Sequence, residues 1–120
     1  WDGFQEERDQ IFSFVHGNHI NGVVLLAADR HRSDLRRIPR SDGYDFHEMM
    51  SSRLTNVHTH ELVKDAEGSE FIIGYNEKCS FGLLTFNTTV DDPTIGYTIV
   101  NIDGEEVGQA TLNLRQMQMR

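Results

Sequence analysis

The chain has 120 residues, 38% of them hydrophobic, which suits one folding unit over residues 1–120 because a second hydrophobic core would not fit. Nineteen acidic and eleven basic residues leave a formal net charge of -8, which argues against general nucleic-acid binding because most of the surface would repel phosphate. The single cysteine, Cys79, excludes an internal disulfide and a zinc site built from several thiolates.

The first half of the chain predicts one helix and one buried strand. Residues 2–17 predict an amphipathic helix with Asp2 as its N-cap and with Ile11, Phe14 and Val15 on one face. Residues 20–28 are almost purely apolar and predict a strand buried on both faces, as in a sheet layered by helices. This apolar run is too short to cross a bilayer, so we expect no transmembrane segment.

The next segments differ sharply in composition. Residues 30–40 are rich in charge and include Pro39, which predicts a loop, whereas residues 44–50 predict a short strand. Residues 56–78 lack clear periodicity and predict mostly loop, with a turn at residues 65–68.

The last third of the chain predicts a three-stranded antiparallel meander. Residues 81–86 form a short apolar run, and residues 94–102 alternate with Ile95, Tyr97 and Ile99 on one side. Asp103-Gly104 then predicts a tight hairpin turn into residues 107–114, because this dipeptide tolerates positive φ angles.

The segment that carries chemistry is Asp29-Arg30-His31, which follows the predicted buried strand. In an extended chain residues two apart point to the same side, so the Asp29 carboxylate and the His31 imidazole can converge on one metal ion. Two ligands are fewer than even a four-coordinate metal needs, so further ligands must come from elsewhere. The alternative is that Asp29 caps the following loop and that His31 is a solvent-facing histidine.

Residues 27–35, Ala-Ala-Asp-Arg-His-Arg-Ser-Asp-Leu, resemble the Gly-Asp-Arg-His-x-Ser-Glu-Leu segment of PhoD-like alkaline phosphatases, which are calcineurin-like metallophosphoesterases. Three other stretches are similar to segments of that family in the same order: Trp1-Asp2-Gly3-Phe4, residues 44–55 and Ser80-Phe81-Gly82-Leu83-Leu84-Thr85-Phe86. Two residues depart from the family pattern. Ala28 replaces a glycine whose backbone freedom a strained turn would need, and Ser80 replaces an asparagine.

The resemblance implies an α+β or α/β fold, the carboxy-terminal part of an αββα metallophosphoesterase sandwich with one helix, a buried strand and a terminal antiparallel β meander. It also implies a periplasmic or secreted enzyme with two or more metal ions, for example calcium, iron, zinc or manganese, that hydrolyses small phosphate esters with a metal-activated water or hydroxide. The start at Trp1, without an initiator methionine or a signal-peptide pattern, is interpreted as a cut, and the missing ligands are expected upstream.

On this resemblance Asp29 and His31 bind metal, Arg30 is the candidate catalytic residue, and Arg30 and Arg32 bind the phosphate of the substrate. Five arginines lie within residues 30–40, and a guanidinium presents a planar donor fork that suits a phosphate oxyanion. The alternative is that these arginines solvate a loop and pair with the carboxylates of Asp29, Asp34 and Asp42.

We expect the 120-residue chain to be inactive by itself. Two other functional classes stay open: a non-catalytic binding or structural β-rich module, and a phosphate-binding pseudoenzyme. His58 and His60 form a second pair of histidines two residues apart, but no buried strand precedes them, so the sequence predicts a surface loop there.

Overall fold

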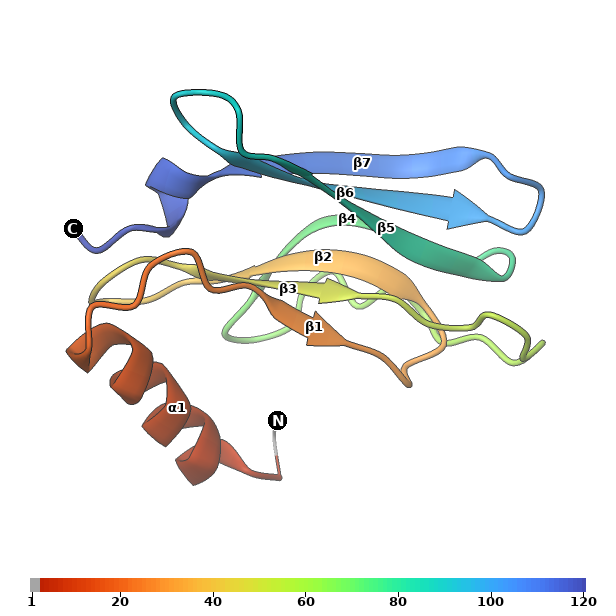
Figure 1. Cartoon of the computed structure of the whole chain (residues 1–120). Coiled ribbons are helices and arrows are strands. Elements are labelled where there is room, and N and C mark those ends of the chain that lie inside the picture. Colours follow the sequence, from red (N-terminus) through yellow and green to blue (C-terminus); the bar gives the residue numbers. More distant parts are fainter. Residues whose placement is uncertain (1–2) are drawn as a thin grey trace.

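The computed structural model describes residues 3–120, which form one helix, two β-sheets and a short 3-10 helix (Figure 1). In the first sheet the strands lie in the order β1-β3-β2-β4, and in the second the order is β5-β6-β7. The elements are α1 (Gln5–Gly17), β1 (Leu25–Ala27), β2 (Ser33–Ile38), β3 (Phe46–Met50), β4 (Glu70–Tyr75), β5 (Ser80–Asn87), β6 (Thr94–Asn101), β7 (Glu106–Asn113) and η1 (Leu114–Met117).

The fold is mainly β, so the predicted α/β class with a carboxy-terminal αββα sandwich is wrong. Helix α1 lies below the first sheet, and the second sheet lies above it (Figure 1). The predicted strand over residues 20–28 shrinks to the three residues of β1 at the sheet edge, where Leu26 is 68% exposed. Residues 20–23 are not in the sheet because their backbone groups bond elsewhere: Ile20 O and Val23 N to the Tyr44 hydroxyl, and Gly22 N to Met117 O.

The charge-rich segment over residues 30–40 is not a loop, because it contains the interior strand β2. This strand pairs antiparallel with both β3 and β4. Its side chains point alternately to the two faces of the sheet. On one face the fully buried Leu35 packs toward the second sheet, and on the other Asp34 and Arg36 belong to a buried ion-pair cluster. Sequence periodicity did not identify this strand, because some of its buried positions hold charged residues instead of apolar ones. Such residues can be buried only because they pair with each other.

Strand β4 was also missed, because residues 56–78 were predicted to be mostly loop. The predicted turn before it is confirmed at Glu67 and Gly68, where Gly68 has a φ of 75°. Strand β3 confirms the predicted strand over residues 44–50.

Helix α1 is confirmed as an element, but its predicted buried face is confirmed only at Val15. Ile11 and Phe14 are exposed, whereas Phe12, Val15 and His16 are buried. The rings of Phe12 and His16 both pack on Phe46, with centroid distances of 4.4 and 5.0 Å. Phe4 occupies the N-cap position without a side-chain hydrogen bond, and the predicted cap, Asp2, lies outside the described residues.

The terminal meander β5-β6-β7 is confirmed, with Ile95, Tyr97 and Ile99 buried on one face of β6. The hairpin between β6 and β7 is wider than a two-residue turn. Asn101 N donates to Glu105 O at 2.9 Å, and Gly104 has a φ of 80°. Glycine at this left-handed position is the usual end of a three-residue hairpin loop.

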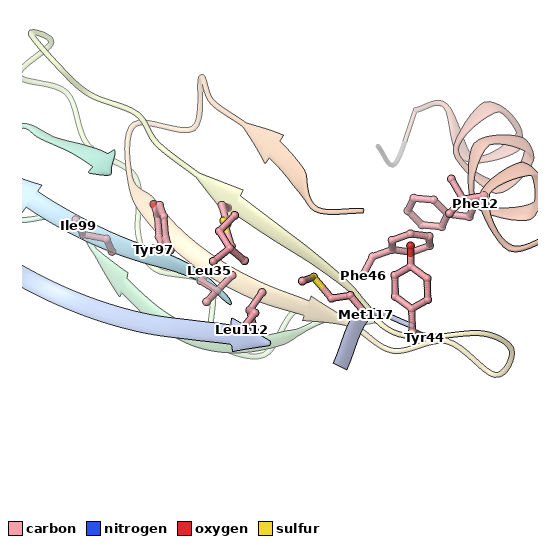
Figure 2. Close-up of a cluster of buried hydrophobic side chains, with 11 residues drawn as sticks. Phe12, Leu35, Tyr44, Phe46, Tyr97, Ile99, Leu112 and Met117 are labelled. Carbon is pink, nitrogen blue, oxygen red and sulfur yellow. The ribbon is translucent and has the colours of Figure 1, made fainter. Parts of the chain in front are cut away.

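The core runs continuously from the space between the two sheets to the helix (Figure 2). Leu35, Tyr97, Ile99 and Leu112 form the part between the sheets, and Phe12, Tyr44 and Phe46 form the part beside α1. Met117 of η1 lies between the two groups in Figure 2. Within residues 3–120, no helix is long and apolar enough to span a membrane.

Candidate functional site

The Asp29-Arg30-His31 segment forms the bend between β1 and β2. Because β3 lies between those strands in the sheet, the bend crosses the carboxyl end of β3. Two hydrogen bonds fasten it there: Ser51 N donates to Ala27 O at 2.9 Å, and His31 N donates to Ser52 Oγ at 3.2 Å. The segments after β1 and after β3 lie at the same end of the sheet (Figure 1).

The backbone of this bend is left-handed, not extended. Asp29 has a φ of 72° and His31 a φ of 48°. The argument that extended geometry points both side chains to one side is therefore wrong for this segment. Aspartate and histidine adopt such angles more readily than most residues, so the bend is compatible with both. Ala28 has no positive φ, so its replacement of the family's glycine introduces no backbone strain of that kind.

The two predicted metal ligands differ in their surroundings. Asp29 is exposed, whereas His31 is half-buried and its Nδ1 atom is buried without a hydrogen-bond partner. Among residues 3–120, no group of three or more His, Cys, Asp and Glu side chains forms a ready metal site. One carboxylate and one imidazole nitrogen without a hydrogen-bond partner nevertheless form a partial ligand set that suits zinc, iron or manganese.

His31 lies beside two histidines that the sequence placed in a separate surface loop. Its ring centroid is 5.7 Å from that of His58 and 5.4 Å from that of His60, and the His58 and His60 centroids are 5.2 Å apart. Loss of hydration lowers the pKa of His60, and the neighbouring His58 and His31 lower it further. The only sequence signal for this cluster was the spacing of two between His58 and His60.

The predicted phosphate-binding arginines are not equivalent. Arg32 is buried, and its Nε donates to Asp34 Oδ2 at 2.7 Å. Arg36 Nε approaches the same oxygen at 3.5 Å. Arg37 pairs with Asp45 and Glu70, and Arg40 with Asp42, so four of the five arginines in residues 30–40 have a carboxylate partner. Arg30 is exposed and has no ion pair within the described residues.

A cleft of about 470 Å³ opens beside the bend, on the face of the first sheet that α1 partly covers. Its polar lining comes mainly from Arg30, Arg32, Arg36 and Glu48. A second hollow of about 450 Å³ continues it toward Phe12 of α1 and shares Arg36 and Glu48 with it. The resulting groove is basic at the end that holds the Asp29-Arg30-His31 bend.

Sequence reasoning missed Glu48 as part of the cleft, and it included Arg36 only as one of the five arginines of residues 30–40. Arg36 and Glu48 are direct partners in the register of β2 and β3, a relationship that only the sheet creates. Arg36 is fixed by Ser69 Oγ at 3.3 Å and by the carbonyl of Val63. Burial raises the pKa of the Glu48 carboxyl, and the negative charge of Asp34 raises it further, against the opposing effect of Arg36 and Arg32.

Comparison of the chain with protein-family models, curated proteins and solved structures finds no significant match. The resemblance to PhoD-like phosphatases therefore rests on the sequence motifs alone and stays a prediction.

Proposed function

We propose that this chain is the carboxy-terminal part of a metal-dependent phosphoesterase, with Asp29 and His31 as metal ligands and with Arg30 and Arg32 as phosphate-binding residues. The supporting observation is the position of the Asp29-Arg30-His31 bend at the mouth of a cleft lined by three arginines. A phosphate ester in this cleft can accept hydrogen bonds from arginine side chains of β2 and of the bend, which lie at one end of the same sheet.

Arg30 has the larger part in phosphate binding, because its charge is not balanced by a carboxylate. Its fork of N–H donors is free to meet two oxygens of one phosphoryl group. Arg32 Nε is already bonded to Asp34, so only its Nη groups remain for the anion. In a chain of net charge -8, the unpaired charge of Arg30 draws an anion to the bend rather than to the rest of the surface.

The metal ion, when bound, supplies an activated water and neutralises charge on the phosphoryl oxygens. Asp29 Oδ and His31 Nδ1, which has no hydrogen-bond partner, are the groups of this chain that would hold it. The hydrogen bond from His31 N to Ser52 Oγ keeps the bend attached to the segment that follows β3, so it fixes the backbone that carries the imidazole. Arg30, which lies between the two ligands, orients the phosphate beside them.

The test is calorimetric titration of the 120-residue chain with Mn²⁺ and then with inorganic phosphate. We expect phosphate binding that metal strengthens. Arg30→Ala should weaken it by about tenfold or more, since a charge-assisted hydrogen bond contributes about 1.5–3 kcal/mol. Arg115→Ala, an exposed arginine at the other end of the chain, is the matched control and should bind phosphate normally.

The variants Asp29→Asn and His31→Asn test whether these two residues bind the metal ion. Asparagine keeps the tolerance for positive φ that both positions need. Each variant should bind metal more weakly and lose the metal-dependent part of phosphate binding. Normal metal and phosphate binding by both variants would refute the proposal.

Turnover provides a separate test. The 120-residue chain should not hydrolyse a chromogenic phosphate ester efficiently, because Asp29 and His31 alone do not complete a coordination sphere. In a longer protein that contains this chain, hydrolysis should require both residues. Phosphate binding without hydrolysis there would identify a pseudoenzyme instead.

A second candidate is a non-catalytic β-rich module. The observation that favours it is the apolar outer side of edge strand β5, where Phe81 and Leu83 are exposed. Apolar residues on a strand edge are typical of a surface that meets another protein. Unchanged metal and phosphate binding in the Asp29, Arg30 and His31 variants would leave this as the better assignment.

A further inference from the structure

Three histidine side chains from two distant segments gather at one end of the first sheet. His31 belongs to the bend between β1 and β2, whereas His58 and His60 belong to the long connection between β3 and β4. Their ring centroids are mutually 5.2, 5.4 and 5.7 Å apart. Half of the six histidines of the chain therefore lie in a single cluster, here called the histidine cluster.

Hydrogen bonds from two side chains to backbone carbonyls hold the two segments of the histidine cluster together. Thr59 lies between His58 and His60 in sequence, and its hydroxyl is within hydrogen-bond distance of two carbonyl oxygens, His31 O at 3.2 Å and Asn76 O at 2.9 Å, which share its one proton. Asn76 Nδ2 in turn donates to His60 O at 2.9 Å. The connection is thus fastened both to the bend and to the residue that follows β4, which keeps the three imidazoles near one another.

The spacing of the rings suits a shared metal ion. With zinc–nitrogen bonds of about 2.0–2.1 Å and tetrahedral angles, the ring centroids of three ligating histidines lie about 5 Å apart. The three rings do not form a ready coordination group as they stand. His58 is exposed, so a change of its side-chain rotamer meets little resistance from neighbouring atoms. His31 Nδ1 is already a buried nitrogen without a hydrogen-bond partner.

We propose that His31, His58 and His60 together bind one borderline divalent transition-metal ion, of which Zn²⁺ is the reference, through three imidazole nitrogens. Three histidines with an open fourth position form a ligand set that zinc accepts in proteins. Imidazole also suits copper, nickel and cobalt, whereas the hard ions calcium and magnesium prefer oxygen ligands. The site goes beyond the proposed phosphoesterase function, because it shares only His31 with it and requires neither Asp29 nor a phosphate.

The structural role of such a site is to join the bend to the connection between β3 and β4. Both segments border the arginine-lined cleft: Arg30 lies next to His31, and Val63 of the connection forms part of the cleft wall. Metal binding by the histidine cluster therefore restricts movement of the cleft wall relative to the bend.

The experiment is isothermal titration of the 120-residue chain with Zn²⁺, followed by Co²⁺ absorption spectroscopy. We expect one ion per chain and a cobalt spectrum of nitrogen ligation. His58→Ala, His60→Ala and His31→Asn should each weaken zinc binding at least about tenfold, because even loss of a second-shell partner costs 10–100-fold. His19→Asn, an exposed histidine outside the cluster with a φ of 55°, is the control and should bind zinc normally.

Asp29→Asn separates this site from the proposed phosphoesterase site. Weakened zinc binding in the three histidine variants but not in Asp29→Asn supports the histidine cluster. Weakened binding in Asp29→Asn and His31→Asn, with normal binding in His58→Ala and His60→Ala, overturns it and leaves the phosphoesterase ligands in place. Normal zinc binding in all four variants overturns the histidine cluster, whereas the proposed phosphoesterase site is decided by the Mn²⁺ and phosphate titration. His58 and His60 lie in a connection without regular structure, so circular dichroism of their metal-free variants should match that of the parent chain.

Discussion

The Nε atom of Arg32 lies 2.7 Å from Oδ2 of Asp34, and both side chains are buried. Arg36 approaches the same carboxylate oxygen at 3.5 Å, so one negative charge faces two guanidiniums beneath the cleft. The pair makes β2 compatible with burial. Because Asp34 and Glu48 both lie against Arg32 and Arg36, the unpaired positive charge at the cleft is that of Arg30.

Asp34→Asn should destabilise the chain by about 3–5 kcal/mol, because it keeps the shape of the side chain but removes the carboxylate that pairs with the buried Arg32 and faces Arg36. Urea denaturation at pH 7 measures the effect. Asp9→Asn is the control, since the exposed Arg8–Asp9 pair contributes at most about 1 kcal/mol. Equal stabilities of the two variants would show that the buried cluster is not a stabilising unit.

Gly82→Ala should destabilise the chain by about 1–3 kcal/mol through overpacking. A Cβ atom at Gly82 would overlap the Tyr97 ring at its Cε2 atom, well inside van der Waals contact distance. Tyr97 cannot yield easily, because its hydroxyl donates to Met50 O and its ring is buried. Gly96→Ala is the matched strand control, with no atom closer than 3.8 Å, and its midpoint of thermal unfolding should stay close to that of the parent.

The hydroxyls of Ser33 and Ser80 share a buried hydrogen bond of 3.0 Å that connects β2 to β5. Ser33 also shares a hydrogen bond with the phenol of Tyr97. Ser33→Ala should therefore cost more than Ser80→Ala, each within about 1–3 kcal/mol. The double variant should cost less than the sum, by about 0.5–1.5 kcal/mol, in a double-mutant cycle measured by chemical denaturation. Strict additivity would mean that the two hydroxyls do not interact in solution.

The raised pKa of Glu48 should make the free energy of unfolding depend on pH. Burial raises the pKa of its carboxyl in the folded state above the usual 4.5, so the folded chain favours the protonated form. The associated stability is present below pH 4.5 and is lost as the pH rises through the folded-state pKa. As the pH rises from 4.5 to the folded-state pKa of Glu48, the parent chain should therefore lose stability relative to Glu48→Gln, as measured by the free energy of unfolding. A constant difference across this pH range would contradict the assignment.

Local patterns in the sequence were sufficient for the terminal meander. Alternation in β6 identified Ile95, Tyr97 and Ile99 as one buried face, and Gly104 marked the hairpin that joins β6 to β7. Each of these strands pairs with its neighbour in sequence, so the information needed to form the sheet is local.

The first sheet depends on pairings that no local pattern reports. Strand β1 pairs in parallel with β3, and β2 joins β3 to β4 although its sequence reads as a charged loop. A polar residue enters a sheet interior only when a specific partner compensates its burial, and the partner of Arg36 across the strand is Glu48.

The sequence by itself determined the residue types of the candidate site: the carboxylate and imidazole of Asp29-Arg30-His31, the adjacent arginines and the spacing of His58 and His60. Only the tertiary structure decided that Arg32 is paired and Arg30 is not, and that His31 meets His58 and His60. The physical reason is that residue type and spacing set what a side chain can bind. Pairing and proximity depend on which segments the sheet brings to one end, and this is a property of the whole fold.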